Sequence, residues 1–237
     1  MFDMRYLEDM AHGYPYGFLA IDNFTKYMWI IPIENKETPE LIRAMGEIVK
    51  AMGKPKKIYS DYEPGMENSI EFPKWLEEHN ILHIVTRSHA NTAERAIRTF
   101  KDLLTRRIEN KEIEPGEVWY TTKILYAILL KYNNKMVNRT IGMTPEQATE
   151  PKNEAHVRTM LEINAIRKRK YPDIKVGDRV KIYKKKKVFD KERISVWTEL
   201  SYEVEDIKDE KGQDFYYLSG HYRPLLRHEI LKVRAGT

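Results

Sequence analysis

Three acidic side chains stand at positions where carboxylates can act together. Asp3 lies in the first apolar stretch, Asp61 directly follows an Ile-Tyr-Ser run, and Glu94 falls in the first turn of a long helical pattern. In α/β sheets, functional groups collect at strand ends and helix starts, so residues far apart in the sequence can converge there. Three carboxylates at one place repel one another unless a cation neutralises them. The pattern therefore predicts a divalent-metal site, and the alternative is that each acid is an isolated surface, turn or capping residue.

The available ligands decide which metal and which chemistry are expected. The 237 residues contain no cysteine, which excludes a disulfide scaffold, a Cys-based zinc finger, a thiol nucleophile and a thiolate-held iron–sulfur cluster within this chain. Hard carboxylate oxygens favour Mg²⁺ or Mn²⁺. Two such ions about 3.5–4 Å apart clamp the attacking and leaving oxygens of a phosphoryl transfer. A two-ion phosphoryl-transfer site is the expected chemistry.

Basic residues follow Glu94 at helical spacing. Arg98 and Lys101 lie one and two turns further on, and the offsets of four and seven residues put all three on one helix face. This face is predicted to bind the phosphates of DNA, as is Arg87 in the loop before the helix. The alternative is a plain Glu–Arg pair on a solvated surface, worth about 0.3–0.5 kcal/mol.

The positive charge is concentrated towards the C-terminus. The chain has a net charge of +5, but residues 1–151 carry 20 Lys and Arg against 22 Asp and Glu, whereas residues 152–237 carry 21 against 14. Such asymmetry is typical of a phosphate-backbone binder, and a solvated lysine face is the alternative. The predicted DNA-binding residues in this part are Lys168, Arg169, Lys184, Lys185, Lys186 and Lys187.

The elements that must position these residues follow from the apolar periodicity. Strands are expected at Met1–Leu7, Tyr16–Asp22, Lys26–Ile33, Lys57–Ser60 and Ile81–Thr86, the second and third as a hairpin. Helices are expected at 38–53, 68–80, 91–109, 117–132, a short stretch from Thr144, and 153–170. Strands followed by alternating helix and strand predict a layered α/β domain.

The pattern changes near Val176 to short β-like runs at Arg179–Tyr183, Tyr202–Ile207 and Phe215–Leu218. These runs predict a small all-β barrel. Its large aromatic residues are expected to be core, because so small a domain has few others to bury. They are Tyr183, Phe189 and Trp197. The predicted organisation is a catalytic core over 1–151, a basic helical linker over 152–174 and a DNA-binding barrel over 175–237.

Several blocks resemble a known family. They are Phe2-Asp3-Met4, Ala20 to Tyr27, Tyr59-Ser60-Asp61 and Ala93-Glu94-Arg95 with Arg98-Thr99-Phe100-Lys101. In this order they are similar to the successive blocks of retroviral-type integrase catalytic cores. Tyr132-Asn133-Asn134 with Ile141 to Glu146 resembles the segment that closes the core in retrotransposon and Maverick/Polinton integrases. Val176 to Val180, with Phe189, Trp197 and Arg223 to Val233, looks like their C-terminal SH3-like barrel.

The resemblance implies an RNase H-like fold with a mixed five-stranded sheet and flanking helices, followed by the SH3-like barrel. It carries the family's D, D, E triad onto Asp3, Asp61 and Glu94, with 32 residues between the last two. The implied activity is DNA integration, in which 3′ ends are trimmed and then joined to target DNA with two Mg²⁺ or Mn²⁺ ions. A homo-oligomer acting on element ends and target DNA is implied, with no small-molecule substrate. A catalytically inactive DNA-binding protein and an RNase H-like nuclease are the alternatives.

Some features depart from the family. Relatives have Asn-Gly after the second Asp, whereas Tyr62-Glu63-Pro64-Gly65 follows Asp61. Glu63 is either a further metal ligand or a solvated turn acid. Asp9 and Asp22 compete with Asp3 for the first ligand position, and Asp22 is interpreted as a structural hairpin residue. The His-His-Cys-Cys zinc module expected before the core is not present in the sequence.

The apolar runs are too short to cross a bilayer. The longest, Tyr27 to Ile33 and Ile124 to Leu130, have seven residues each, whereas a spanning helix needs about 20. The N-terminus lacks a basic start followed by an apolar stretch, so no secretory signal is expected. The prediction is an intracellular protein without a membrane partner, located in the nucleus of a eukaryotic host.

Overall fold

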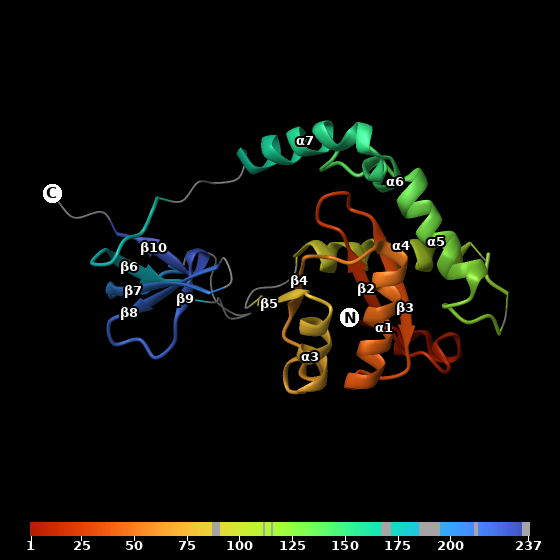
Figure 1. The fold of residues 1–237 in the computed structure, drawn as a ribbon, viewed down its shortest axis with the longest axis horizontal. Helices are drawn as coiled ribbons and strands as arrows, with labels where there is room; N and C mark the ends of the chain where they lie inside the picture. Colours follow the sequence, from red (N-terminus) through yellow and green to blue (C-terminus); the bar gives the residue numbers. More distant parts are fainter. Residues whose placement is uncertain are drawn as a thin grey trace. The chain divides into compact units, whose positions relative to one another are not determined.

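The computed structural model describes residues 1–86, 91–110, 112–114, 116–166, 172–184, 195–210 and 213–233. These residues divide into two compact units, Met1–Lys168 and Arg169–Thr237 (Figure 1). They are called the larger and the smaller unit below, and each is described by itself. The division lies within the linker predicted for 152–174. In the described parts of the chain, no helix is both long enough and apolar enough to span a membrane.

The larger unit begins with a three-stranded antiparallel sheet. Its strands are β1 (Phe2–Asp3), β2 (Tyr16–Ile21) and β3 (Met28–Ile33), in the order β1-β2-β3. The predicted β2–β3 hairpin is confirmed. Asp22 closes its turn, because the carboxylate accepts hydrogen bonds from the backbone N–H and the hydroxyl of Thr25. This local role agrees with the structural interpretation of Asp22.

A second sheet pairs β4 (Lys57–Asp61) with β5 (Leu82–Thr86) in parallel. The resemblance implied one five-stranded sheet, but no pairing between β1 and β4 is found in the described residues. The strand predicted over Met1–Leu7 is wrong beyond Asp3. There the Asp3 carboxylate accepts the Arg5 backbone N–H at 2.8 Å, which is an Asx-type turn that bends the chain out of the strand. A 3₁₀ segment, Arg5–Ala11, follows.

The helices of the larger unit agree best with the prediction where the apolar stripe is long. They are α1 (Thr38–Met52), α2 (Pro64–Glu67), α3 (Glu71–Glu78), α4 (Asn91–Glu109), α5 (Ala127–Leu130), α6 (Pro145–Thr149) and α7 (Glu154–Ile166). The predictions for α1 and α4 are confirmed, and α1 ends at Gly53, whose φ of 84° suits glycine. The helix predicted over 68–80 is shorter and follows the separate turn α2. The helix predicted over 117–132 starts only at Thr122, and α5 lies between two π-helical turns.

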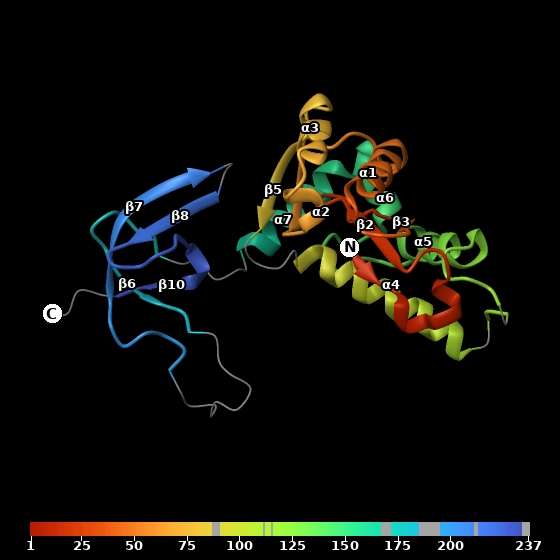
Figure 2. The same ribbon diagram turned by 90° about the horizontal axis from the view of Figure 1, so that it is seen from below.

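Amphipathic helices cover both faces of the three-stranded sheet, and Figure 2 shows α1 and α4 on opposite sides of β2 and β3. Alternate β3 residues point to opposite faces. Ile31 and Ile33 pack with α1 and α3, whereas Met28 and Ile30 pack with α4 and α5. These two cores pack on the same three-stranded sheet. They thereby hold β1, which carries Asp3, and α4, which carries Glu94, in fixed positions.

A buried amide fastens the last part of this unit to the sheet. The Asn133 side chain is 1% exposed. Its Oδ1 accepts the Met28 backbone N–H at 3.0 Å, and its Nδ2 donates to the Met28 carbonyl at 2.9 Å. Asn133 therefore acts as a substitute strand partner for β3. This contact gives the middle residue of the Tyr132-Asn133-Asn134 block a structural role.

The smaller unit is an antiparallel sheet in the order β10-β6-β7-β8-β9. Its strands are β6 (Arg179–Ile182), β7 (Tyr202–Glu210), β8 (Gln213–Leu218), β9 (Leu225–Leu226) and β10 (Ile230–Lys232). The described residues show no pairing that closes this sheet into a barrel. Its core contains the buried Val180, Val204 and Leu225.

One predicted core residue of the smaller unit lies at its surface. Tyr183 is 46% exposed and contacts the edge of Trp197, with ring centroids 5.7 Å apart. The interior is filled instead by aliphatic residues of β6 to β10 together with Tyr216, so the core prediction is wrong for Tyr183. Phe189 lies outside the described residues.

Candidate active site

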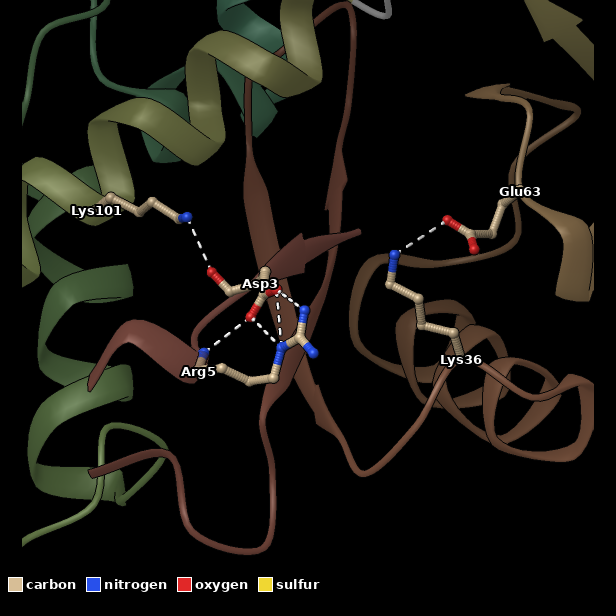
Figure 3. A network of polar contacts seen from close by, with 5 residues as sticks. All are labelled: Asp3, Arg5, Lys36, Glu63 and Lys101. Carbon is tan, nitrogen blue, oxygen red and sulfur yellow. Dashed lines mark hydrogen bonds and ion pairs between the residues drawn. The ribbon is translucent and has the colours of Figure 1, made fainter. Parts of the chain in front are cut away.

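The Asp3 carboxylate is held by its own neighbour Arg5 (Figure 3). The Arg5 Nε lies 3.1 and 3.0 Å from the two Asp3 oxygens, and Nη2 lies 2.5 Å from Oδ2. With the Arg5 backbone N–H, both carboxylate oxygens accept hydrogen bonds. The Arg5 guanidinium thus occupies the position on the Asp3 carboxylate that a bound cation would take.

This pair lies in contact with water. The Arg5 side chain is 65% exposed and that of Asp3 45%. The hydrogen bonds from the Arg5 side chain lower the pKa of Asp3, and the charge of Lys101 acts in the same direction. Asp3 is therefore ionised at neutral pH, and its carboxylate is paired with the Arg5 guanidinium.

Lys101 reaches the same residue from α4, as Figure 3 shows. Its Nζ donates to the Asp3 backbone carbonyl at 2.9 Å and lies 4.8 Å from the centre of the Tyr6 ring. Burial lowers the pKa of Lys101, although the charge of Asp3 opposes that effect. The predicted exposed position thus proves to be half-buried. Lys101 links α4 to β1, and its predicted contact with DNA remains a prediction.

Asp61 is the last residue of β4 and is exposed. Burial lowers the pKa of the Met1 amino group, while the charges of Glu63 and Asp61 act to raise it. Glu63 forms an ion pair with Lys36, with 3.5 Å between Nζ and Oε2.

A hydroxyl, an imidazole and a carboxylate support the end of β4. The Ser60 Oγ lies 2.8 Å from the His83 Nε2, and the His83 Nδ1 lies 3.3 Å from the Glu67 Oε1. The imidazole thereby connects β4, β5 and α2. The contact fixes the residue before Asp61 relative to the strand that leads towards α4.

Glu94 stands in the first turn of α4 and is exposed, as is Arg98 one turn further on. The predicted apolar stripe of this helix is confirmed, because Ala96, Phe100 and Leu104 are buried on its other side. The helix therefore presents an acid and a base to solvent at the predicted spacing.

The three predicted ligands do not form a recognisable metal-binding group in the structure. Among the described residues, no set of three or more His, Asp or Glu side chains is placed to hold one ion. Asp3, Asp61 and Glu94 thus remain a predicted triad. Of the predicted DNA-binding residues, Lys184 is exposed after β6. Six others lie outside the described residues: Arg87, Lys168, Arg169, Lys185, Lys186 and Lys187.

Two side chains of this region were not singled out by the sequence. Arg5 had a usable signal, because an Arg two residues after an Asp at a strand end can close an Asx-type turn and pair with it. His83 had none, since its two partners come from residues 16 and 23 positions away.

Several known proteins are similar to this chain in sequence or in structure. No protein-family model matches the chain. A stretch of 130 residues is 29% identical to the retrovirus-related Pol polyprotein from transposon 297 of Drosophila melanogaster, and it spans 54% of this chain but only 12% of that polyprotein. A cryo-electron-microscopy structure of the simian T-cell lymphotropic virus intasome, in complex with the PP2A regulatory subunit B56 gamma, contains a chain with a TM-score of 0.63 at 15% identity. That likeness covers 93% of this chain and 78% of the intasome chain.

The isolated HTLV-2 integrase catalytic core domain, in complex with magnesium, matches less closely. It has a TM-score of 0.47 at 22% identity over 56% of this chain and 84% of that domain. The likeness to the intasome chain extends beyond the larger unit, because it covers 93% of the residues. The chain thus has the mixed α/β fold of a retroviral-type integrase core, followed by a C-terminal antiparallel sheet.

Proposed function

We propose that this chain is a metal-dependent DNA integrase of a transposable element, of the Maverick/Polinton type that its C-terminal blocks resemble. The supporting observation is the position of the three acids in an integrase-like fold. Asp3 lies on β1, Asp61 ends β4, and Glu94 lies in the first turn of α4. Lys101 ties the Glu94 helix to the Asp3 strand.

The side-chain types of the proposed site suit a divalent cation, because all three are carboxylates. Asp3 already binds a positive group with both carboxylate oxygens. Asp61 and Glu94 add only carboxylate oxygens, which are hard ligands that suit Mg²⁺ or Mn²⁺. When bound, two such ions supply charge stabilisation for an in-line phosphoryl displacement.

The side chains of this chain perform the remaining tasks. Asp3, Asp61 and Glu94 would hold the ions through their carboxylate oxygens. Arg98 binds a backbone phosphate one turn along α4, because it is exposed on the face of Glu94. Water attacks a phosphodiester near the end of the element, which breaks the P–O3′ bond, frees the 3′ hydroxyl and releases the terminal nucleotides with a 5′ phosphate. The freed 3′ hydroxyl then attacks a phosphodiester of the target, forms a new P–O3′ bond and displaces the 3′ oxygen of the target strand as its leaving group.

The DNA is held further by the basic residues of the C-terminal part, and these contacts are expected to be sequence-independent. Lys184 represents this group among the described residues, because it is exposed at the end of β6. Phosphate contacts of this kind weaken steeply as salt rises. Both ends of the element must be joined to one target, so we propose that the chain acts as a homo-oligomer in the nucleus of its host.

Incubation of the full chain with Mn²⁺, a fluorescent blunt-ended duplex of the element end and a supercoiled plasmid tests this function. Joined products are expected for the unmodified chain, and Asp61→Asn should abolish them. Asp102→Asn is the matched control, because Asp102 is also exposed on the larger unit but lies about two turns further along α4 than Glu94. Joining that survives in Asp61→Asn would contradict the proposal.

A non-catalytic DNA-binding protein is the second candidate, because Arg5 occupies both oxygens of Asp3. Salt-sensitive binding of the duplex without any cleavage supports that candidate. Cleavage without joining supports an RNase H-like nuclease. The same assay therefore separates the three functions.

A further inference from the structure

Arg5 stands out among the charged residues near the proposed site because it competes for the atoms that a metal would need. Its guanidinium donates to both Asp3 oxygens, with the shortest contact at 2.5 Å. A divalent cation on Asp3 must use at least one of the same oxygens. Arg5 and the ion therefore cannot both keep their full set of contacts.

The surroundings make this pair easy to open. With 65% of the Arg5 side chain exposed, water can solvate the guanidinium as it leaves, and exposed ion pairs contribute little to stability. The Arg5 side chain has a further contact on the same surface, since its Cζ lies 5.4 Å from the centre of the Tyr16 ring. The guanidinium can therefore swing away without leaving the surface of the sheet.

The backbone of Asp3 is held independently of this pair. Lys101 donates to the Asp3 carbonyl and is itself half-buried against Tyr6. Loss of the Arg5 contact thus leaves β1 fastened to α4. Figure 3 shows the two basic side chains approaching Asp3 on different atoms, with Arg5 on the carboxylate and Lys101 on the carbonyl.

We propose that Arg5 is an exchange residue: it neutralises Asp3 in the metal-free protein, is displaced from the carboxylate by the divalent ion, and then binds a DNA phosphate next to that ion. A guanidinium released from a carboxylate keeps the planar fork that suits phosphate oxygens equally well. DNA binding and metal binding are thereby coupled through one side chain. This inference rests on the proposed function, because it takes Asp3 as a metal ligand.

The first test measures Mn²⁺ binding to the full chain without DNA, by the electron paramagnetic resonance signal of free Mn²⁺. Arg5→Gln is expected to bind Mn²⁺ about two- to fivefold more tightly than the unmodified chain, since no guanidinium has to be displaced. Arg5→Lys should also bind more tightly, by a smaller factor, because it keeps the charge but loses the fork. Arg158→Gln is the matched control, as Arg158 is 63% exposed and paired with Glu154.

Unchanged or weaker Mn²⁺ binding in Arg5→Gln overturns the proposal. Binding by Arg5→Lys equal to that of the unmodified chain also overturns it, since the gain would then reflect local charge alone. Asp3→Asn in the Arg5→Gln background must remove the gain. If Asp3→Asn and Asp61→Asn both leave Mn²⁺ binding unchanged, the metal site of the proposed function fails, which is a different result.

The second test measures the affinity for a fluorescein-labelled duplex by anisotropy at 4 °C, with EDTA or with Mn²⁺. Arg5→Gln should weaken DNA binding only when Mn²⁺ is present, because Arg5 is otherwise occupied by Asp3. Arg98→Gln should weaken it under both conditions, since Arg98 lies exposed on α4. An equal loss for Arg5→Gln with EDTA and with Mn²⁺ contradicts the exchange.

Discussion

Two ion pairs, one in each unit of this chain, differ in their exposure to water. In the larger unit, Asp3 and Arg5 pair at the surface, with side-chain exposures of 45% and 65%. In the smaller unit, Glu229 is 22% exposed in its pair with Arg223, and its Oε2 also accepts the Leu226 backbone N–H. Water competes for the first pair and much less for the second. The first is suited to exchange and the second to stabilising a small sheet.

A second ion pair in the smaller unit, between Asp178 and Lys232, is also partly shielded from water. Asp178 accepts from Lys232 Nζ at 2.6 Å and from the Lys175 backbone N–H at 2.7 Å. It ties the turn before β6 to β10. A sheet of this size has a limited apolar core, so partly buried polar contacts contribute a larger share of its stability. The described part of the larger unit has three apolar clusters, so its stability depends less on the exposed pair of Asp3 and Arg5.

Replacement of Glu94 tests whether the charged residues of the larger unit serve catalysis. It has the largest expected effect, which is on strand joining. Glu94→Gln should reduce strand joining by about 10³-fold or more, since it removes a ligand of an ion that stabilises transition-state charge. The thermal midpoint should stay unchanged because Glu94 is exposed. Gel quantification of joined product and differential scanning calorimetry measure the two. Equal loss of activity and stability would place Glu94 among the structural residues.

Replacement of Asn133 shows where the larger unit obtains its stability. Asn133→Leu should destabilise it by about 2–4 kcal/mol, because it leaves the buried N–H and C=O of Met28 without partners. Chemical denaturation followed by tryptophan fluorescence measures the change. Asn134→Leu is the matched control at an exposed neighbouring position. Equal effects of both variants would show that the amide contact is unimportant.

Removal of the Glu229 charge tests the structural pair of the smaller unit. Glu229→Gln is expected to destabilise this unit by about 1–2 kcal/mol, as it weakens a charged hydrogen bond to Arg223 and to the Leu226 N–H. Hydrogen exchange of amides in β8 and β10 reports the change for this unit alone. Faster exchange in the larger unit but not in the smaller one would contradict the contrast.

The same pair predicts a pH dependence. Burial alone would raise the pKa of Glu229, but Arg223 and the Leu226 N–H outweigh it, so the pKa is lowered. The unfolded chain then binds the proton more readily than the folded one. The pair stabilises the unit above the usual glutamate pKa of about 4.3 and loses this effect as pH falls through the lower folded value. Exchange rates of Glu229→Gln and the unmodified chain should therefore converge as the pH is lowered, and rates that diverge would reverse the sign.

The smallest effect is expected for the stability of Arg5→Gln. The Asp3–Arg5 pair lies in water, so no measurable change in thermal midpoint is expected although Mn²⁺ binding changes. A midpoint lowered as much as by Glu229→Gln would show that the Asp3 pair is structural too. The thermal midpoints of Arg5→Gln and Glu229→Gln therefore compare the structural roles of the two ion pairs directly.

The sequence alone determined the features that depend on local periodicity. The stripe of apolar residues predicted α4 over its full length, and Pro39 with Gly53 marked the ends of α1. It also placed Asp61 at a strand end and Glu94 in a first helical turn. Each of these depends on neighbours within a few positions, which the sequence displays directly.

Only the tertiary structure decided the partners of the polar side chains. Lys101 was predicted to be exposed, yet it turns inward to a carbonyl 98 positions away. Asn133 bonds to Met28 across 105 positions. Periodicity fixes which face of an element is apolar, because that depends on local geometry alone. Which charge meets which is decided by distances between elements, and those exist only once the cores have packed.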